Sequence, residues 1–269
     1  MEFSFTKLHG CSNDYLFADC TDGPLERAGE VSRIVSDRRR GVGSDGIILI
    51  YPSETADLRM EMYNADGSRG QMCGNGIRCL GKYAYEHRLV ANDSLTVETD
   101  AGIKQLQLHI RAGLVESVTV DMGTPVGEIL DHTLEVGDET WNITCVSMGN
   151  PHAVTFDADP GGLDLPRLGP LFAEHRFFPN GTNTEFARID TPTRISMRVW
   201  ERGSGETMAC GTGACAVVVA AVHGGLAQRA CTVLLRGGQL DIEYRESGTV
   251  LMTGPAVEVF SASVTVELD

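Results

Sequence analysis

Two similar glycine-rich segments, MCGNGIRC and ACGTGACA, lie in different halves of the chain and contain Cys73 and Cys210. These cysteines are 137 positions apart (210 − 73) in a chain of 269 residues, close to half its length. The same ungapped offset aligns further pairs: Asn13 with Asn150, Gly46 with Asn183, Met60 with Met197, Tyr63 with Trp200, Asn64 with Glu201, Gly74 with Gly211, and Gly76 with Gly213. Because similarity at one fixed offset indicates an internal repeat, we interpret the chain as two homologous halves that share one site.

Each Cys-Gly segment lies where a strand-like pattern changes to a helical one. Alternating or apolar runs at 47–51, 58–64 and 194–202 precede the cysteines and predict strands. Helical spacing follows Cys73, and the nearly all-apolar run ACAVVVAAVHGG follows the second cysteine and predicts a buried helix. Further strands are expected at 94–100, 103–110, 115–122, 231–236, 239–245 and 256–267. The sequence therefore predicts a strand-rich α/β fold with one buried central helix in each half.

The boundary between the halves is expected near residues 111–123. We assign residues 1–117 to the N-terminal half and residues 118–262 to the C-terminal half. The last strand, residues 263–269, is expected to return to the N-terminal half.

The charge of the chain excludes several classes of partner. Acidic residues number 37 against 22 basic ones, so the formal net charge is −15, which disfavours binding to nucleic acid or an anionic membrane. The one short basic run, at 38–40, is too small for such a surface. No stretch approaches the roughly 18 apolar residues of a membrane span, and the first residues lack the features of a signal peptide. We expect a soluble, cytoplasmic protein.

The eight cysteines do not form a metal or redox motif. No pair has the C-x-x-C spacing of a zinc site or a redox dithiol. Cysteine outside such motifs usually packs as a small apolar side chain. We expect this of six of them: Cys11, Cys20, Cys79, Cys145, Cys215 and Cys231.

Cys73 and Cys210 are different because each is expected at the start of a helix. The helix dipole and the free N–H groups there stabilise a thiolate, and the neighbouring glycines let backbone N–H groups approach a carboxylate. Two such thiols on opposite faces of one carbon suit racemisation or epimerisation, in which one removes a proton and the other returns one.

Pyridoxal phosphate is the usual alternative for stabilising an amino-acid carbanion, and it needs a lysine. The chain has three lysines, Lys7, Lys82 and Lys104, and none lies in an obvious phosphate-binding context. A mechanism without a cofactor, in a dry site rich in hydrogen-bond donors, fits the sequence better.

Five motifs in one order, HGCSNDY, YNADGSRGQMCGNGIRC, MGNPHAV, NTEF and WERGSGETMACGTGACA, resemble the diaminopimelate epimerase family. The resemblance implies conversion of LL-diaminopimelate to the meso form without cofactor or metal, in lysine and cell-wall precursor biosynthesis. It also implies two pseudo-symmetric halves, each a curved, mostly antiparallel sheet around a central helix, with the site in the cleft between them. A homodimer is expected at the family level.

The resemblance also implies roles for particular residues. Cys73 and Cys210 match the two catalytic bases, and His152 and Glu201 match polar neighbours that tune the thiols. The remaining matches are to substrate-binding residues: Asn13, Asn64, Gly74, Asn75, Asn150, Asn183, Glu201, Arg202, Gly211 and Thr212. Arg202 is the candidate fork for the distal carboxylate of a diamino diacid. One departure is Ser12, where the family commonly has glycine, and there we expect at most a local adjustment of the backbone.

Two other functions remain open. A proline or hydroxyproline racemase of the same fold would also use paired thiols, but such enzymes typically have histidine where this chain has Asn75. A thiol redox or metal-binding protein is disfavoured by the cysteine spacing. The segment GVGSDG at 41–46 matches a dinucleotide fingerprint, but it leads into a strand and not into a helix. We expect it to form a turn that borders the site.

Overall fold

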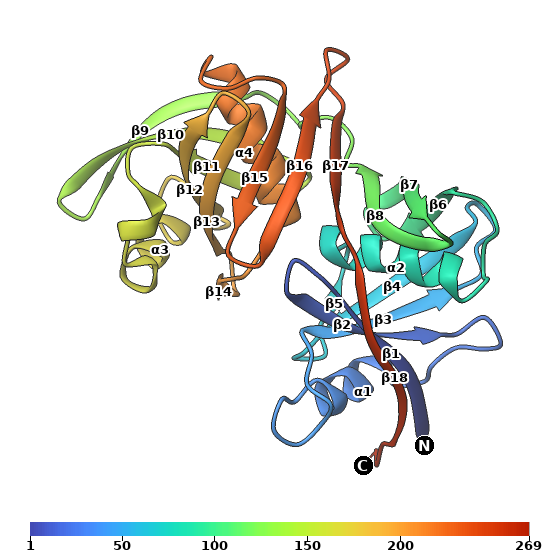
Figure 1. The fold of residues 1–269 in the computed structure, drawn as a ribbon. Helices are drawn as coiled ribbons and strands as arrows, with labels where there is room; N and C mark the ends of the chain where they lie inside the picture. Colours follow the sequence, from blue (N-terminus) through green and yellow to red (C-terminus); the bar gives the residue numbers. More distant parts are fainter. Residues whose placement is uncertain (269) are drawn as a thin grey trace. The chain divides into compact units, whose positions relative to one another are not determined.

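The computed structural model describes residues 1–268 and divides into two units (Figure 1). The first unit comprises Met1–Val120 together with the C-terminal segment that starts at Gly254, and the second comprises Asp121–Thr253. The division after Val120 lies three residues beyond the predicted one. The return to the first unit begins at Gly254 instead of 263, because the last strand already pairs with the first one from Val257 onward.

The first unit is a sheet curved around one helix. Its strands pair in the order β18, β1, β2, β3, β4, β6, β7, β8, with short β5 beside β4, and only β2–β3 and β4–β6 are parallel. The elements are β1 (Glu2–Gly10), β2 (Asn13–Asp19), α1 (Ala28–Val35), β3 (Gly46–Tyr51), β4 (Leu58–Asn64), β5 (Arg69–Gly70), α2 (Gly74–Glu86), β6 (Ser94–Thr99), β7 (Gly102–Arg111), β8 (Leu114–Asp121) and β18 (Val257–Thr265).

The second unit repeats this arrangement. Its strands pair in the order β9, β10, β11, β12, β13, β15, β16, β17, with short β14 beside β13, and the parallel pairs are β11–β12 and β13–β15. The elements are β9 (Leu130–Val136), β10 (Glu139–Ser147), β11 (Pro151–Thr155), η1 (Pro160–Gly162), α3 (Leu165–Ala173), β12 (Asn183–Thr191), β13 (Arg194–Glu201), β14 (Gly205–Glu206), α4 (Gly211–His223), β15 (Ala230–Leu235), β16 (Gly238–Tyr244) and β17 (Val250–Pro255).

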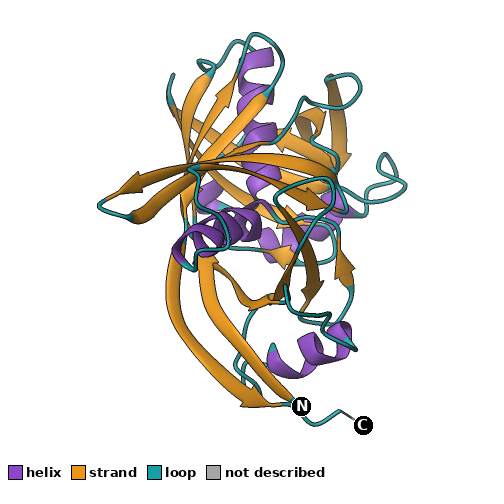
Figure 2. Ribbon diagram, turned by 90° about the vertical axis from the view of Figure 1, so that its right-hand side faces the viewer, coloured by secondary structure: helices purple, strands orange, loops and turns teal. Residues whose placement is uncertain are grey.

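The two sheets have the same sequence of parallel and antiparallel pairs, so β18 takes in the first unit the place that β9 takes in the second. The chain is mostly strand with few helices (Figure 2). This confirms the predicted fold class of two similar, mostly antiparallel halves, each with a central helix. Within residues 1–268, none of the helices combines the length and the apolar character that crossing a membrane requires.

Successive side chains of a strand point to opposite faces of its sheet, so each sheet can pack against a helix on either face. Leu16 and Ala18 of β2 pack in the cluster that contains Val31 of α1, whereas Phe17 between them stacks on Tyr83 of the central helix α2. In the second unit, Phe172 of α3 packs on β10 and β12, and α4 lies on the other face of the sheet against β10, β11, β12, β15 and β16. Each central helix is therefore held from its first turn onward.

Candidate active site

Cys73 and Cys210 cap the two central helices with nearly the same geometry. Cys73 has φ −125° and ψ 121° before α2, and Cys210 has φ −118° and ψ 112° before α4. In each case the sulfur accepts a hydrogen bond at 3.4 Å from the backbone N–H three residues later, from Gly76 and Gly213 respectively. A sulfur in this position lies at the positive end of the helix dipole, which favours the thiolate.

Asn13 and Asn75 gather at Cys73. The Cys73 thiol donates to Asn13 Oδ1 at 3.3 Å, and Asn75 Nδ2 donates to the same oxygen at 3.3 Å. Asn13 is held from its other end because its Nδ2 donates to Asp45 Oδ2 at 2.7 Å. Asp45 belongs to the glycine-rich segment at 41–46. The segment at 41–46 therefore holds the side chain of Asn13 in place, a role that the sequence alone did not predict.

A buried arginine supports the same cluster. Arg78 of α2 is 0% exposed, and its guanidinium donates to Asn75 Oδ1 at 2.9 Å and to the Gly74 carbonyl oxygen at 3.0 Å. These bonds orient the Asn75 amide so that its Nδ2 points to Asn13. The only signal in the sequence was the arginine in MCGNGIRC, a charged residue on a helix otherwise expected to be buried.

Tyr15 lies beside Cys73 in this cluster. Burial raises the pKa of Tyr15 well above its usual value, and the neighbouring Cys73 sulfur and Asp45 carboxylate raise it further. The tyrosine is therefore a neutral phenol at physiological pH. The 137-residue offset aligns it with His152, so the two centres place different polar groups at the same position of the repeat.

Asn64 is placed differently from the other predicted residues of the first unit. It ends β4, and its Nδ2 donates to Ser68 Oγ at 3.0 Å in the turn that follows. The structure thus brings Asn13, Gly74 and Asn75 to Cys73 and holds Asn64 in a neighbouring turn.

At Cys210 a continuous chain of polar contacts runs inward from the sulfur. Cys210 Sγ lies 3.5 Å from Thr212 Oγ1, which accepts a hydrogen bond from Asn150 Nδ2 at 3.2 Å. Asn150 Oδ1 lies 3.1 Å from His152 Nε2, and His152 Nδ1 lies 2.7 Å from Glu185 Oε1. Glu185 was not among the predicted site residues, although it stands within the quoted NTEF motif.

Two carboxylates control the electrostatics at Cys210. Burial raises the pKa of the Cys210 thiol well above its usual value, and the charges of Glu201 and Glu185 raise it further. Burial likewise raises the pKa of Glu201, whose Oε1 accepts a hydrogen bond from Thr207 Oγ1 at 2.5 Å. The bonds from Thr212 and the Gly213 N–H act in the opposite direction and favour the thiolate.

Asn183 and Arg202 meet at the end of β13. Asn183 Nδ2 donates to the Pro151 carbonyl oxygen at 3.1 Å, and its Oδ1 accepts from the Arg202 backbone N–H at 2.8 Å. The strand ends at Glu201, so Glu201 and Arg202 are not bound by the alternation that sends neighbours of a strand to opposite faces. The Arg202 guanidinium is exposed and donates to the Asn180 carbonyl oxygen at 2.9 Å.

The remaining cysteines lie inside the units. Cys145 is half-buried on β10, and the others are buried: Cys11, Cys20, Cys79, Cys215 and Cys231. Burial raises the pKa of Cys79 to about 12 and that of Cys145 to about 11, so neither is a thiolate at neutral pH.

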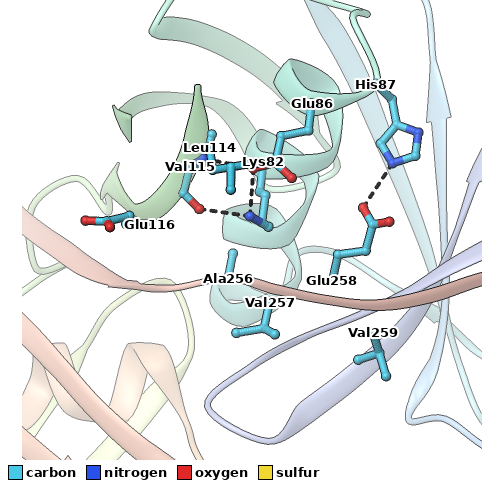
Figure 3. A pocket seen from close by; sticks show the side chains of 10 residues that line it. All are labelled: Lys82, Glu86, His87, Leu114, Val115, Glu116, Ala256, Val257, Glu258 and Val259. Carbon is cyan, nitrogen blue, oxygen red and sulfur yellow. Dashed lines mark hydrogen bonds and ion pairs between the residues drawn. The ribbon is translucent and has the colours of Figure 1, made fainter. Parts of the chain in front are cut away.

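A pocket of about 780 Å³ lies at the C-terminal end of α2, away from the capping cysteine (Figure 3). Lys82 closes one side, donating to Glu86 Oε1 at 2.7 Å and to the Val115 carbonyl oxygen at 2.9 Å. Its lining contains no thiol. This pocket therefore takes no part in the chemistry of the cysteines.

The fold is shared with solved structures of low sequence identity. One is a hydroxyproline epimerase from Agrobacterium vitis, with a TM-score of 0.70 and 14% identity, covering 98% of this chain and 92% of the other. Another is a phenazine biosynthesis protein of the PhzF family from Enterococcus faecalis, with a TM-score of 0.74 and 11% identity, covering 99% and 100%. At these identities the likeness shows the fold alone, which in this chain places one helix-capping cysteine in each unit.

The sequence comparisons identify the family, and with it an isomerase. The model of the diaminopimelate epimerase family matches residues 5–127 and 144–259, and the chain belongs to that family of isomerases. The diaminopimelate epimerase of Agathobacter rectalis is 48% identical, with 97% of this chain and 99% of the other covered. That of Desulfovibrio desulfuricans is 50% identical, with 96% of each chain covered.

Proposed function

We propose that the chain converts LL-2,6-diaminopimelate to the meso form by a two-base reaction at Cys73 and Cys210. One sulfur, as thiolate, takes the α-proton of the substrate and leaves a carbanion, and the other, as thiol, gives a proton to the opposite face. No electrons are transferred, and the two sulfurs exchange protonation states in each turnover. The observation that carries the proposal is the matched capping geometry of the two cysteines, each within one turn of backbone N–H groups.

The substrate's charges fit the groups around each sulfur. We assign the backbone N–H groups of the first helical turns, at Gly74–Asn75 and Gly211–Thr212, to the α-carboxylate, where negative charge grows as the proton leaves. We assign the ammonium groups and the distal carboxylate to the polar residues of the two units, with Arg202 as the fork for the distal carboxylate: Asn13, Asn64, Asn150, Asn183, Glu201 and Arg202. In this proposal side chains and backbone supply the whole site, and neither cofactor nor metal takes part.

A proline or hydroxyproline racemase is the alternative of the same class. The fold is common to both, but the structural relatives of that kind, a probable proline racemase and a hydroxyproline epimerase, are 16% and 14% identical, and Asn75 stands where those enzymes typically have histidine. The position of Asn75 favours diaminopimelate, since its amide is tied to Asn13 and Arg78 as part of the Cys73 cluster. A thiol redox function is less favoured because each thiol lies in a set of polar groups suited to proton transfer.

Exchange of the α-hydrogen in deuterated water distinguishes diaminopimelate epimerisation from proline or hydroxyproline racemisation. We expect deuterium at one α-carbon of diaminopimelate, followed by mass spectrometry and NMR, and none in proline incubated in parallel. Label in proline without label in diaminopimelate would assign the chain to the alternative. No label in either substrate would contradict both.

We further propose that the protein works in the cytoplasm as a homodimer. Support for association comes from β18, which pairs with β1 and leaves Val257, Val259 and Phe260 exposed by 42%, 53% and 43%. Strand edges with exposed apolar side chains favour pairing with another chain. Sedimentation velocity of the wild type and of Phe260→Lys tests this, and a monomeric wild type at micromolar concentration would contradict it.

A further inference from the structure

Glu185 is a fully buried carboxylate that the proposed mechanism does not yet use. It is 0% exposed on β12, with Oε1 2.7 Å from His152 Nδ1. Among residues 1–268, its second oxygen, Oε2, is one of four buried side-chain atoms without a hydrogen-bond partner. Buried carboxylates are costly unless they are paired, so a carboxylate at this position calls for a functional reason.

The repeat shows how this carboxylate is accommodated. The 137-residue offset aligns Glu185 with Ile48, and both side chains face the third residue of a central helix. A Cβ on Gly76 would lie 2.5 Å from Ile48 Cδ1, and a Cβ on Gly213 would lie 2.5 Å from Glu185 Oε1. The same slot therefore holds an apolar side chain beside α2 and a charged one beside α4.

Both ring nitrogens of His152 face an oxygen atom that can accept a hydrogen bond. An ionised Glu185 can only accept, so Nδ1 carries a proton. Asn150 uses its Nδ2 to donate to Thr212, so its carbonyl Oδ1 faces Nε2 and also accepts. An imidazolium at His152, with Glu185 as its counter-charge, satisfies both contacts.

The direction of the remaining contacts follows from this protonation. Thr212 Oγ1 accepts from Asn150, so the Thr212 hydroxyl proton is available to the Cys210 sulfur 3.5 Å away. A hydroxyl that donates to sulfur stabilises the thiolate. The ionised and ionisable groups at this centre come from four elements: His152 on β11, Glu185 on β12, Glu201 on β13 and Cys210 before α4.

We propose that Glu185 is a positioning residue that keeps His152 protonated and thereby directs the Thr212 hydroxyl to the Cys210 thiolate. The inference rests on the proposed function, since it gives one of the two thiols its hydrogen-bond donor. In this proposal Glu185 acts through His152, Asn150 and Thr212.

Removing the charge of Glu185 should reverse the donor and acceptor roles in the hydrogen bonds from His152 to Thr212. In Glu185→Gln the imidazolium loses its counter-charge and releases the Nε2 proton, so Nε2 becomes an acceptor. The Asn150 amide then turns its Nδ2 to the ring and its Oδ1 to Thr212, which donates to Asn150 and no longer to sulfur. Loss of one hydrogen bond to a charged group predicts a fall in kcat of about tenfold with KM changed less than about twofold.

Nitrogen-15 NMR of the histidine ring is the direct test, with His152 identified from a His152→Gln sample. We expect both ring nitrogens of wild-type His152 to be protonated at pH 7.5 and a neutral ring in Glu185→Gln. A neutral ring in the wild type would overturn the proposal without any variant having to fold. A protonated ring in Glu185→Gln would also overturn it.

Kinetics distinguish positioning from a structural effect. Thr212→Val removes the hydroxyl, so in the Glu185→Gln/Thr212→Val double variant kcat should fall no further than in the larger single effect. Independent, additive losses would contradict the proposal. The matched control is Thr184→Val, which removes the partnerless hydroxyl of the preceding residue on β12 and should keep kcat within about twofold.

The two proposals fail in different ways. A wild type without α-hydrogen exchange at diaminopimelate refutes the proposed function, whatever the protonation of His152. A wild type that exchanges hydrogen but has a neutral His152 refutes only the role of Glu185.

Discussion

The two cysteine centres have the same backbone geometry and different surroundings. Cys73 and Cys210 cap their helices within about ten degrees in φ and ψ, and both sulfurs accept from the backbone N–H three residues later at 3.4 Å. Behind Cys73 one branch of the contacts, through Asn75, ends on a buried cation, Arg78, and behind Cys210 the contacts through His152 end on a buried anion, Glu185. Duplication has kept the cap, and the side chains behind it have diverged.

The side-chain neighbours of the two sulfurs also differ. The Asn13 carbonyl oxygen accepts from the Cys73 thiol, whereas the Thr212 hydroxyl oxygen lies 3.5 Å from Cys210 Sγ. Cys210 is also the more enclosed, at 6% exposed, while Cys73 is half-buried. The two thiols of the proposed reaction thus have different surroundings: an amide carbonyl beside Cys73 and a hydroxyl beside Cys210.

The largest effect should come from removing either sulfur. Cys73→Ser and Cys210→Ser should each lower epimerisation by about a thousandfold or more, because a hydroxyl is a far weaker base than a thiolate. Coupled assay of meso-diaminopimelate measures the loss, and circular dichroism confirms folding. If either variant kept near-normal turnover, the two centres would not be equivalent partners in one reaction.

Substitution of Arg78, and of Cys215 at the corresponding position of the repeat, measures how much each buried side chain stabilises its unit. Arg78→Met leaves Asn75 Oδ1 and the Gly74 carbonyl without their donors, so unfolding should become easier by about 3 kcal/mol. Cys215→Ala at the corresponding position removes one sulfur from α4 and should cost about 1 kcal/mol. Urea denaturation measures both. Equal losses would show that the Arg78 network adds nothing to the first unit.

Adding a methyl group at Gly76 and at Gly213 tests the space between each central helix and the strand side chain that faces it, Ile48 or Glu185. In Gly76→Ala the new Cβ meets the end of Ile48, which can rotate, so the cost should be about 1 kcal/mol. In Gly213→Ala it meets Glu185 Oε1, which His152 holds in place, so the cost should be about 2–3 kcal/mol. Urea denaturation of the two variants gives the difference. The reverse order would contradict the carboxylate's position.

The pH dependence of alkylation should distinguish Cys210 from Cys73, because the pKa of Cys210 is raised. Burial, Glu201 and Glu185 raise the pKa of Cys210, so its reaction with iodoacetamide should still be increasing above pH 9, the usual value for a thiol. Glu201→Gln removes one of the charges that disfavour the thiolate, so this pH dependence should move to lower pH. Peptide mapping by mass spectrometry follows each cysteine. An unchanged profile for Cys210 would rule out the charge of Glu201 as a cause.

The smallest effect concerns the turns that lead into the two centres. Ser12 has φ +65°, and the offset aligns it with Gly149, which has φ +95°. Ser12 thus has a left-handed backbone conformation, which glycine adopts without strain and serine does not. Ser12→Gly should stabilise the protein by about 0.5–1 kcal/mol and Gly149→Ala should destabilise it by about 1 kcal/mol, measured by urea denaturation.

Much of this comparison could be predicted from the sequence, because the repeat offset pairs Cys73 with Cys210 and the change from strand-like to helical pattern places each before a helix. The supports behind the sulfurs could not. Glu185 and Arg78 are charged residues that the fold buries, and the periodicity of the sequence does not say what they bond. A strand-like pattern also does not show which strand it pairs with. Residues 257–265 pair with β1 because the edge of the first sheet is open there, and nothing in their own sequence indicates this partner.

Deuterium labelling at early times tests the two-base reaction most directly. With LL-diaminopimelate in deuterated water and less than about a tenth of the substrate converted, we expect deuterium in the meso product and none in the recovered LL substrate. The reason is that the proton removed and the proton delivered belong to different sulfurs. Deuterium in the recovered substrate at a rate equal to that in the product, or unlabelled product, would mean that one base serves both faces and would contradict the pairing of Cys73 with Cys210.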